Sequence, residues 1–221
     1  MMTRMILLLG PTIMIFFGLQ VMGSVPLTFL LFYGWLSAVP FGEMLLVKRQ
    51  KWPETLQHFG LVIKRKNVYH GIYLGIFCFF AIVLSGYFLQ SCFFDKANLQ
   101  NLLVKWHFSG NLLPWLVLTI MFVNPFLEEI YWRGYLFTKL EGKLGKRGIM
   151  FLTSLFYSLY HFLSVIPLFN WPYHIFVIIP VFFAGIVWAY MRIKSNSLIG
   201  SIACHILADS GIMAVYALFL R

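Results

Sequence analysis

Six ionisable side chains lie inside stretches of sequence that are otherwise apolar: Glu128, Glu129, Arg133, His161, His205 and Asp209. An ionised side chain at the centre of a membrane helix costs about 2.5–3.5 kcal/mol on insertion scales, so residues of this kind are rarely accidental. A carboxylate can take a proton from water, and an imidazole can donate to an oxyanion or bind a divalent metal. These residues therefore indicate a functional site with groups suited to hydrolysis or to metal binding.

The spacing of these residues predicts which of them share a helix face. Glu129 and Arg133 are four residues apart and lie on one face, where an ion pair is natural. Glu128 is turned by about 100° from its neighbour, which leaves its carboxylate for another partner such as a water or a metal. His205 and Asp209 are also four residues apart, so both side chains converge on one point.

The depths of three of these side chains agree, although they belong to three separate segments. Glu128 and His205 each lie 11 residues from a basic residue at the end of their segment, or about 16 Å at the helical rise. His161 lies 14 residues from Arg147, or about 21 Å. We expect these side chains to meet in the cytoplasmic half of the membrane or near its midplane.

The elements that hold these residues are expected to be membrane helices. Of the 221 residues, 61% are hydrophobic and only 11% are charged, and the mean hydropathy of +0.83 excludes an ordinary soluble protein. At about 20 residues per span, the length allows seven or eight helices. Seven spans are predicted, at 5–22, 27–47, 69–91, 112–137, 148–168, 174–191 and 198–220. The chain is expected to be one all-α transmembrane domain over 1–221, with its motif-bearing core at about 112–220.

Basic residues cluster between the apolar segments, and they account for the formal net charge of +10. The clusters lie at 48–51, 64–66, 139–147 and 192–194. In a soluble protein this charge would suggest nucleic acid, but here the positive-inside rule explains it, so no nucleic-acid partner is expected. With every cluster in the cytoplasm, the amino terminus is cytoplasmic and Arg221, at the carboxyl terminus, lies outside the cell.

Two connections and one span carry further local signals. Residues 95–106 place leucines at helical spacing and predict an interfacial helix, while 52–66 predicts a short amphipathic connector. Pro125 deprives a backbone carbonyl of its partner and should bend the fourth span, with Asn124 satisfying part of the break. The remaining ionisable residues near span ends are interpreted as interfacial: Glu43, His58, His70, His107 and His174.

Three short motifs together resemble a known family. Residues 128–133 follow the pattern EExxxR, residues 157–161 are a variant of FxxxH with Tyr157 in place of Phe, and residues 205–209 follow HxxxN/D. In this order, on successive apolar spans, they resemble the CPBP family, also called Abi or type II CAAX prenyl endopeptidases. The resemblance covers about 124–214.

This resemblance implies an intramembrane endopeptidase built as a bundle of about eight helices. In the family, the residue that matches Glu128 activates a water, and His161, His205 and Asp209 match the other site residues. Two mechanisms are open: a divalent metal such as zinc held by these four residues, or a metal-free glutamate base with the other residues as oxyanion donors. Glu129, Arg133 and Tyr157 are expected to have supporting roles.

The substrate implied by the resemblance is a membrane-associated or lipidated peptide or protein, either of CAAX type or a bacteriocin precursor. The alternative function is a multi-pass transporter or channel, for which buried charges and a proline-broken helix are also typical. The absence of a repeat between the two halves of the sequence disfavours that alternative. The sequence also lacks HExxH, GxSxG and GxGD, so it does not match other classes of intramembrane protease.

Overall fold

A computed structural model describes residues 2–106 and 110–220, and no strand occurs in that part of the chain. Seven helical segments of the described chain are long and apolar enough to cross a membrane, as the sequence predicts. They run over Arg4–Val21, Val25–Val47, Arg65–Phe93, Gly110–Leu140, Lys146–Val165, Tyr173–Ser195 and Ile199–Leu220. Their ends differ from the predicted ends by a few residues, because basic side chains at a span end can reach the interface and let the helix continue. His107 and Arg221 lie outside the described residues.

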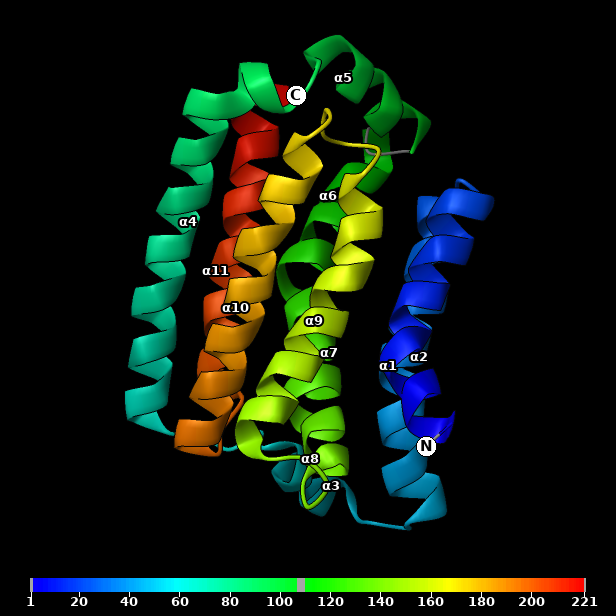
Figure 1. Cartoon of the computed structure of the whole chain (residues 1–221), viewed down its shortest axis with the longest axis vertical. Coiled ribbons are helices and arrows are strands. Elements are labelled where there is room, and N and C mark those ends of the chain that lie inside the picture. The colour runs from blue at the N-terminus through cyan, green and yellow to red at the C-terminus, as the bar shows by residue number, and fades with distance from the viewer. Residues whose placement is uncertain (1, 107–109, 221) are drawn as a thin grey trace.

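The spans form an up-and-down bundle whose chain ends lie at opposite ends of the molecule (Figure 1). Three long helices, α4 (Arg65–Phe93), α10 (Tyr173–Ser195) and α11 (Ile199–Val215), lie on one side, and α9 (Lys146–Val165) lies near the middle. The first two helices, α1 (Met2–Ile15) and α2 (Val25–Phe41), form the opposite side and continue as π turns over Phe16–Val21 and Gly42–Val47. The loops that carry the basic clusters lie together at one end of the bundle, beside the short helix α3 (Trp52–Phe59).

The fourth span is not one regular helix. It consists of α6 (Leu113–Leu118), a π turn over Thr119–Val123, α7 (Asn124–Glu129), a second π turn over Ile130–Tyr135, and α8 (Leu136–Leu140). Pro125 stands in the first turn of α7, directly after the first π turn. A proline has no backbone N–H and so removes one hydrogen-bond donor from the helix. The π turn before it changes which backbone carbonyls accept the remaining hydrogen bonds. The irregular backbone thus lies at the segment that carries Glu128 and Glu129.

The two connections with predicted structure are both partly helical. The interfacial helix is present as α5 (Lys96–Lys105), and Asp95 caps it by accepting a hydrogen bond from the Asn98 backbone N–H at 3.0 Å. The inner connector is helical only over α3, because Gly60 ends it in the left-handed region at φ 86°. The chain is then extended up to the start of α4.

Glu43, near the end of the second span, has partners within the chain that the sequence did not predict. Its carboxylate accepts a hydrogen bond from the Tyr135 hydroxyl at 2.6 Å and pairs with Lys139 at 2.7 Å and Lys48 at 3.3 Å. Two of these partners come from a distant span, so sequence spacing could not indicate them. Glu43 therefore ties the end of the second span to the end of the fourth.

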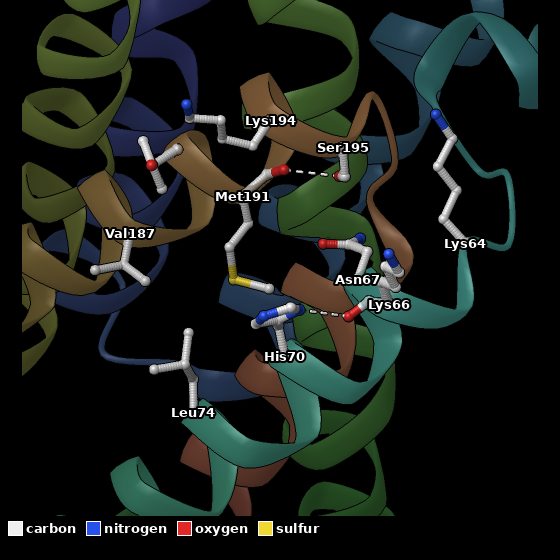
Figure 2. Close-up of a pocket in the computed structure, with 10 residues that line it drawn as sticks. Lys64, Lys66, Asn67, His70, Leu74, Val187, Met191, Lys194 and Ser195 are labelled. Carbon is white, nitrogen blue, oxygen red and sulfur yellow. Dashed lines mark hydrogen bonds between the residues drawn. The ribbon is translucent and has the colours of Figure 1, made fainter.

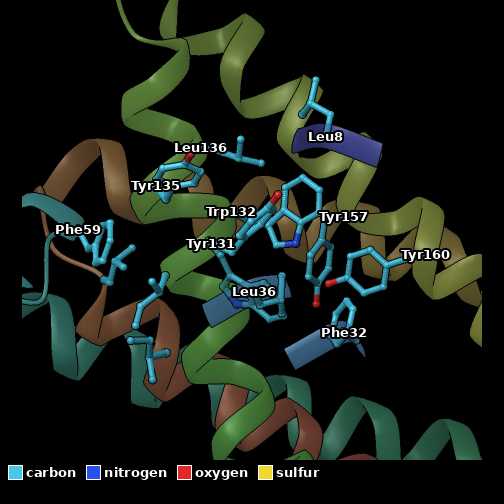
Figure 3. Close-up of a cluster of buried hydrophobic side chains, with 14 of the residues drawn as sticks. Leu8, Phe32, Leu36, Phe59, Tyr131, Trp132, Tyr135, Leu136, Tyr157 and Tyr160 are labelled. Carbon is cyan, nitrogen blue, oxygen red and sulfur yellow. The ribbon is translucent and has the colours of Figure 1, made fainter. Parts of the chain in front are cut away.

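The centre of the bundle is a cluster of buried aromatic rings (Figure 3). The rings of Trp132 and Tyr160 are stacked, with centroids 6.0 Å apart, and Tyr157 packs edge-on against both. Leu8 and Leu36 from the first two helices close the cluster on the other side. These contacts fix the fourth and fifth spans against each other at the level of the ionisable residues.

Candidate active site

A fully buried ion pair joins Glu129 and Arg133, as their spacing predicts. Arg133 Nη1 lies 2.9 Å from Glu129 Oε1, and both side chains have 0% exposure. The guanidinium also donates to the Gly185 carbonyl at 3.2 Å, and it lies over the rings of Tyr157 and Trp188 at 4.4 and 5.3 Å from their centroids. One cation therefore contacts side chains or backbone of the fourth, fifth and sixth spans.

His205, on α11, stands among three carboxylates. Its Nε2 atom lies 3.7 Å from Glu128 Oε2 and 3.6 Å from Asp209 Oδ1. Its Nδ1 atom lies 3.5 Å from Glu129 Oε1. The imidazole is buried, with 1% exposure, so these charges interact with little screening by water. The structure thus brings together the ionisable residues of the fourth and seventh spans.

The two adjacent glutamates have different environments. Glu129 is paired with a guanidinium, whereas the nearest positively chargeable group to Glu128 in the described chain is the imidazole of His205. The Glu128 Oε2 atom is buried and has no hydrogen-bond partner among the described residues. The Tyr160 hydroxyl lies beside this carboxylate. A buried carboxylate oxygen of this kind is suited to hold and deprotonate a water.

Asp209 is held by a chain of side-chain hydrogen bonds. The Asn124 amide donates to Asp209 Oδ2 at 3.1 Å, and the Tyr33 hydroxyl donates to Asn124 Oδ1 at 3.3 Å. Asn124 therefore positions Asp209, and among the described residues its side chain makes no hydrogen bond to the backbone break near Pro125 that it was expected to satisfy. The reason is geometric, because the α7 turn directs this amide toward α11.

Two aromatic residues position the imidazole of His205. The Trp188 ring is stacked on it, with centroids 4.0 Å apart and planes 19° apart. The Tyr157 hydroxyl lies 3.4 Å from His205 Nε2, so this residue supplies a polar group as well as packing. Sequence reasoning missed the roles of Trp188 and of Tyr33. The available signal for Tyr33 was a phenol near the middle of a span, but an aromatic residue in a membrane helix is too common to single out Trp188.

His161 is the predicted site residue that the structure holds apart. Its Nδ1 atom is 2.9 Å from the Tyr157 carbonyl oxygen, and its ring contacts Tyr157 and Tyr160, each with centroids 4.4 Å apart. Among the described residues, no ion pair or hydrogen bond joins it to Glu128 or to His205. Glu128, Glu129, His205 and Asp209 form what we call the acidic cluster. His161 is separated from this cluster by the rings of Tyr157 and Tyr160.

The donor atoms of the four proposed zinc ligands do not converge on one point. Within the described part of the chain, no group of three or more His, Cys, Asp or Glu side chains is arranged to hold a metal ion. Glu128, His205 and Asp209 approach one another as charge partners, while His161, the fourth proposed ligand, stays outside the group. The arrangement does not fit a four-ligand zinc site.

Comparisons with known proteins identify one related family. Residues 110–211 match the family model described as type II CAAX prenyl endopeptidase Rce1-like. The matched region begins with the fourth span, ends within α11 and includes the three motifs. Comparisons with curated proteins and with solved structures find no match. The family match confirms the resemblance that the motifs carry.

The buried pair predicts a difference in stability between variants of the two adjacent glutamates. We expect Glu129→Gln and Arg133→Leu each to lower the Tm of the purified protein, because removing one partner strands a buried charge at about 3–5 kcal/mol. Glu128→Gln is the matched control, since it removes a carboxylate that has no guanidinium partner, and its Tm should stay near that of the wild type. Thermal melts in one detergent make the comparison. Equal losses of Tm for Glu128→Gln and Glu129→Gln would contradict the division of roles.

Proposed function

We propose that Glu128 is the base of a hydrolytic reaction catalysed by this chain. The premise is that the chain belongs, through residues 110–211, to the Rce1-like family of type II CAAX prenyl endopeptidases. The family is one of intramembrane CAAX-type endopeptidases, and the seven spans make this chain a multi-pass membrane protein. The substrate in this proposal is a membrane-associated or lipidated peptide, either of CAAX type or a peptide precursor.

One observation carries the assignment of the base. Glu128 and His205 come from different spans and approach to 3.7 Å inside an apolar bundle, while Glu128 Oε2 has no hydrogen bond to a described residue. A carboxylate that is buried without a matched cation is unfavourable for folding, so a role in the reaction best accounts for its presence. Arg133 is already matched by Glu129 and is not free to neutralise it.

The proposed reaction needs only water and the peptide. Glu128 takes a proton from a water, whose oxygen attacks the carbonyl carbon and forms a tetrahedral oxyanion. His205 and the protonated carboxyl of Asp209, which Asn124 holds in place, donate to that oxyanion. Glu128 then passes its proton to the leaving nitrogen as the C–N bond breaks. His161 packs against Tyr160 and, in this proposal, holds that tyrosine beside Glu128.

We place the basic end of the bundle in the cytoplasm, because the positive-inside rule favours that orientation. The amino terminus is then cytoplasmic and the carboxyl terminus external, with the site toward the cytoplasmic side. Topology reporters fused after Lys66 and after Lys146 should report the cytoplasm, and a fusion after Asn101 should report the outside. A fusion after Lys146 that reports the outside would reverse the orientation.

Removal of the proposed base is the direct test of the function. Glu128→Gln keeps the size of the side chain but cannot accept the proton, so cleavage of a fluorogenic membrane-peptide panel should fall by about 10²–10⁴-fold. Glu141→Gln is the matched control, because it removes an exposed carboxylate at the end of the same span and should leave cleavage unchanged. Full activity of Glu128→Gln would refute the assignment of the base.

Asp209 separates the metal-free mechanism from the metal alternative. An asparagine can donate a hydrogen bond at any pH, so it can replace Asp209 as an oxyanion donor. It lacks the negative charge that makes a carboxylate a good metal ligand, so it cannot replace Asp209 in a metal site. We therefore expect Asp209→Asn to keep most of its cleavage activity, to extend it to alkaline pH and to resist chelators. Cleavage assays with and without a chelator, alongside elemental analysis, make the measurement. Stoichiometric zinc in the active wild type, lost together with activity in Asp209→Asn, would establish the metal mechanism instead.

A further inference from the structure

A cavity of about 500 Å³ lies between the first turns of α4 and the last turns of α10 (Figure 2). Three lysines line its rim: Lys64, Lys66 and Lys194. Its wall is apolar and includes Leu74, Val187 and Met191. This cavity is separate from the acidic cluster, and no residue of the three motifs lines it.

The lysines at the rim are available to an external anion. No acidic residue lines the cavity, and within the described chain none of the three lysines has an ion-pair partner. The Lys194 Nζ atom lies over the ring of Tyr190, 5.5 Å from its centroid, and Tyr190 also lines the cavity. Three cations around a cavity without a counter-ion favour the binding of a negatively charged group.

The other polar groups of the cavity are turned toward their own backbone. His70 Nδ1 lies 2.6 Å from the Lys66 carbonyl oxygen, and the Ser195 hydroxyl donates to the Met191 carbonyl at 2.7 Å (Figure 2). The Asn67 amide is buried and donates to the Ser197 carbonyl at 3.3 Å, which ties α4 to the loop after α10. These bonds fix the wall, and the three lysines are the charged groups that line the cavity.

The position of the cavity points to a lipid as the source of the anion. It lies at the basic end of the bundle, at the start of the α4 span. The rim is charged, whereas the wall continues into the span through Leu74 and Val187. The Leu74 side chain is half-buried and that of Val187 is exposed. A free anion would use the lysines alone, whereas a phospholipid would use the rim for its phosphate and the apolar wall for an acyl chain.

We propose that this cavity binds the headgroup phosphate of an anionic phospholipid, with the acyl chain lying along the apolar wall of α4 and α10. Basic pockets between membrane helices at the cytoplasmic side commonly have this use. The lysines provide the electrostatic attraction, and the lipid bridges the ends of two helices that contact α11. This inference does not depend on the proposed peptidase activity, because it involves none of the residues of the acidic cluster.

The test compares lipid binding by the purified full chain and two charge-matched variants. The site variant is Lys64→Gln with Lys66→Gln and Lys194→Gln. The control variant is Lys143→Gln with Lys146→Gln and Arg147→Gln, which removes the same charge from exposed positions at the same end of the bundle. Binding of phosphatidylglycerol and of phosphatidylcholine is measured by native mass spectrometry, and a Tm measured in detergent without lipid checks that each variant is folded.

We expect the wild type and the control variant to retain phosphatidylglycerol in preference to phosphatidylcholine, and the site variant to bind it about 100-fold more weakly. Inorganic phosphate and glycerol phosphate, which have no acyl chains, should not displace the bound lipid at millimolar concentration. Equal loss of binding in both variants would overturn the proposal in favour of diffuse surface charge. Displacement of the lipid by inorganic phosphate would overturn the lipid as the source of the anion.

Discussion

The ion pair between Glu129 and Arg133 is the interaction on which the rest of the site depends. A guanidinium inside an apolar bundle is tolerable only where its charge and its donors are matched, and here they contact Glu129, a carbonyl of α10 and two aromatic faces. Those partners belong to three spans, so the pair sets how closely these helices approach. Trp188 lies against this guanidinium and is also stacked on His205, which links the rotation of the imidazole to the same pair.

In the proposed mechanism two adjacent glutamates have different roles, and the helical turn between them gives them different partners. Both carboxylates lie near the His205 imidazole, at 3.5 Å for Glu129 and 3.7 Å for Glu128, but Glu129 is also paired with Arg133 on its own helix. Proton transfer needs a group whose charge is not already committed to a strong partner. In the proposed mechanism, one carboxylate of the double-glutamate pattern holds the helix in place and the other reacts.

Much of the bundle can be predicted from the sequence, because each span is a continuous apolar run bounded by polar residues. The local pair of Glu129 and Arg133 is equally predictable, since it depends on helical spacing alone. Depth along the membrane brings Glu128 and His205 to one level, but depth says nothing about rotation around a helix axis. That is why His161 stands at a similar level and yet faces Tyr157 and Tyr160. The partners of Asn124 and Glu43 depend in the same way on packing between distant spans.

The contact between α4 and α11 restricts how the bundle can open. A methyl group on Gly71 would collide with the Gly200 backbone, and one on Gly200 would collide with Asn67, so these two helices meet backbone to backbone. The Asn67 side chain that lies at this contact is itself bonded to the Ser197 carbonyl, so the two helices cannot easily slide past each other. The helix α11, which carries His205, therefore forms one rigid unit with α4. In the proposed reaction, a peptide would therefore reach the acidic cluster from the flank of α11 that faces away from α4, and not between α4 and α11.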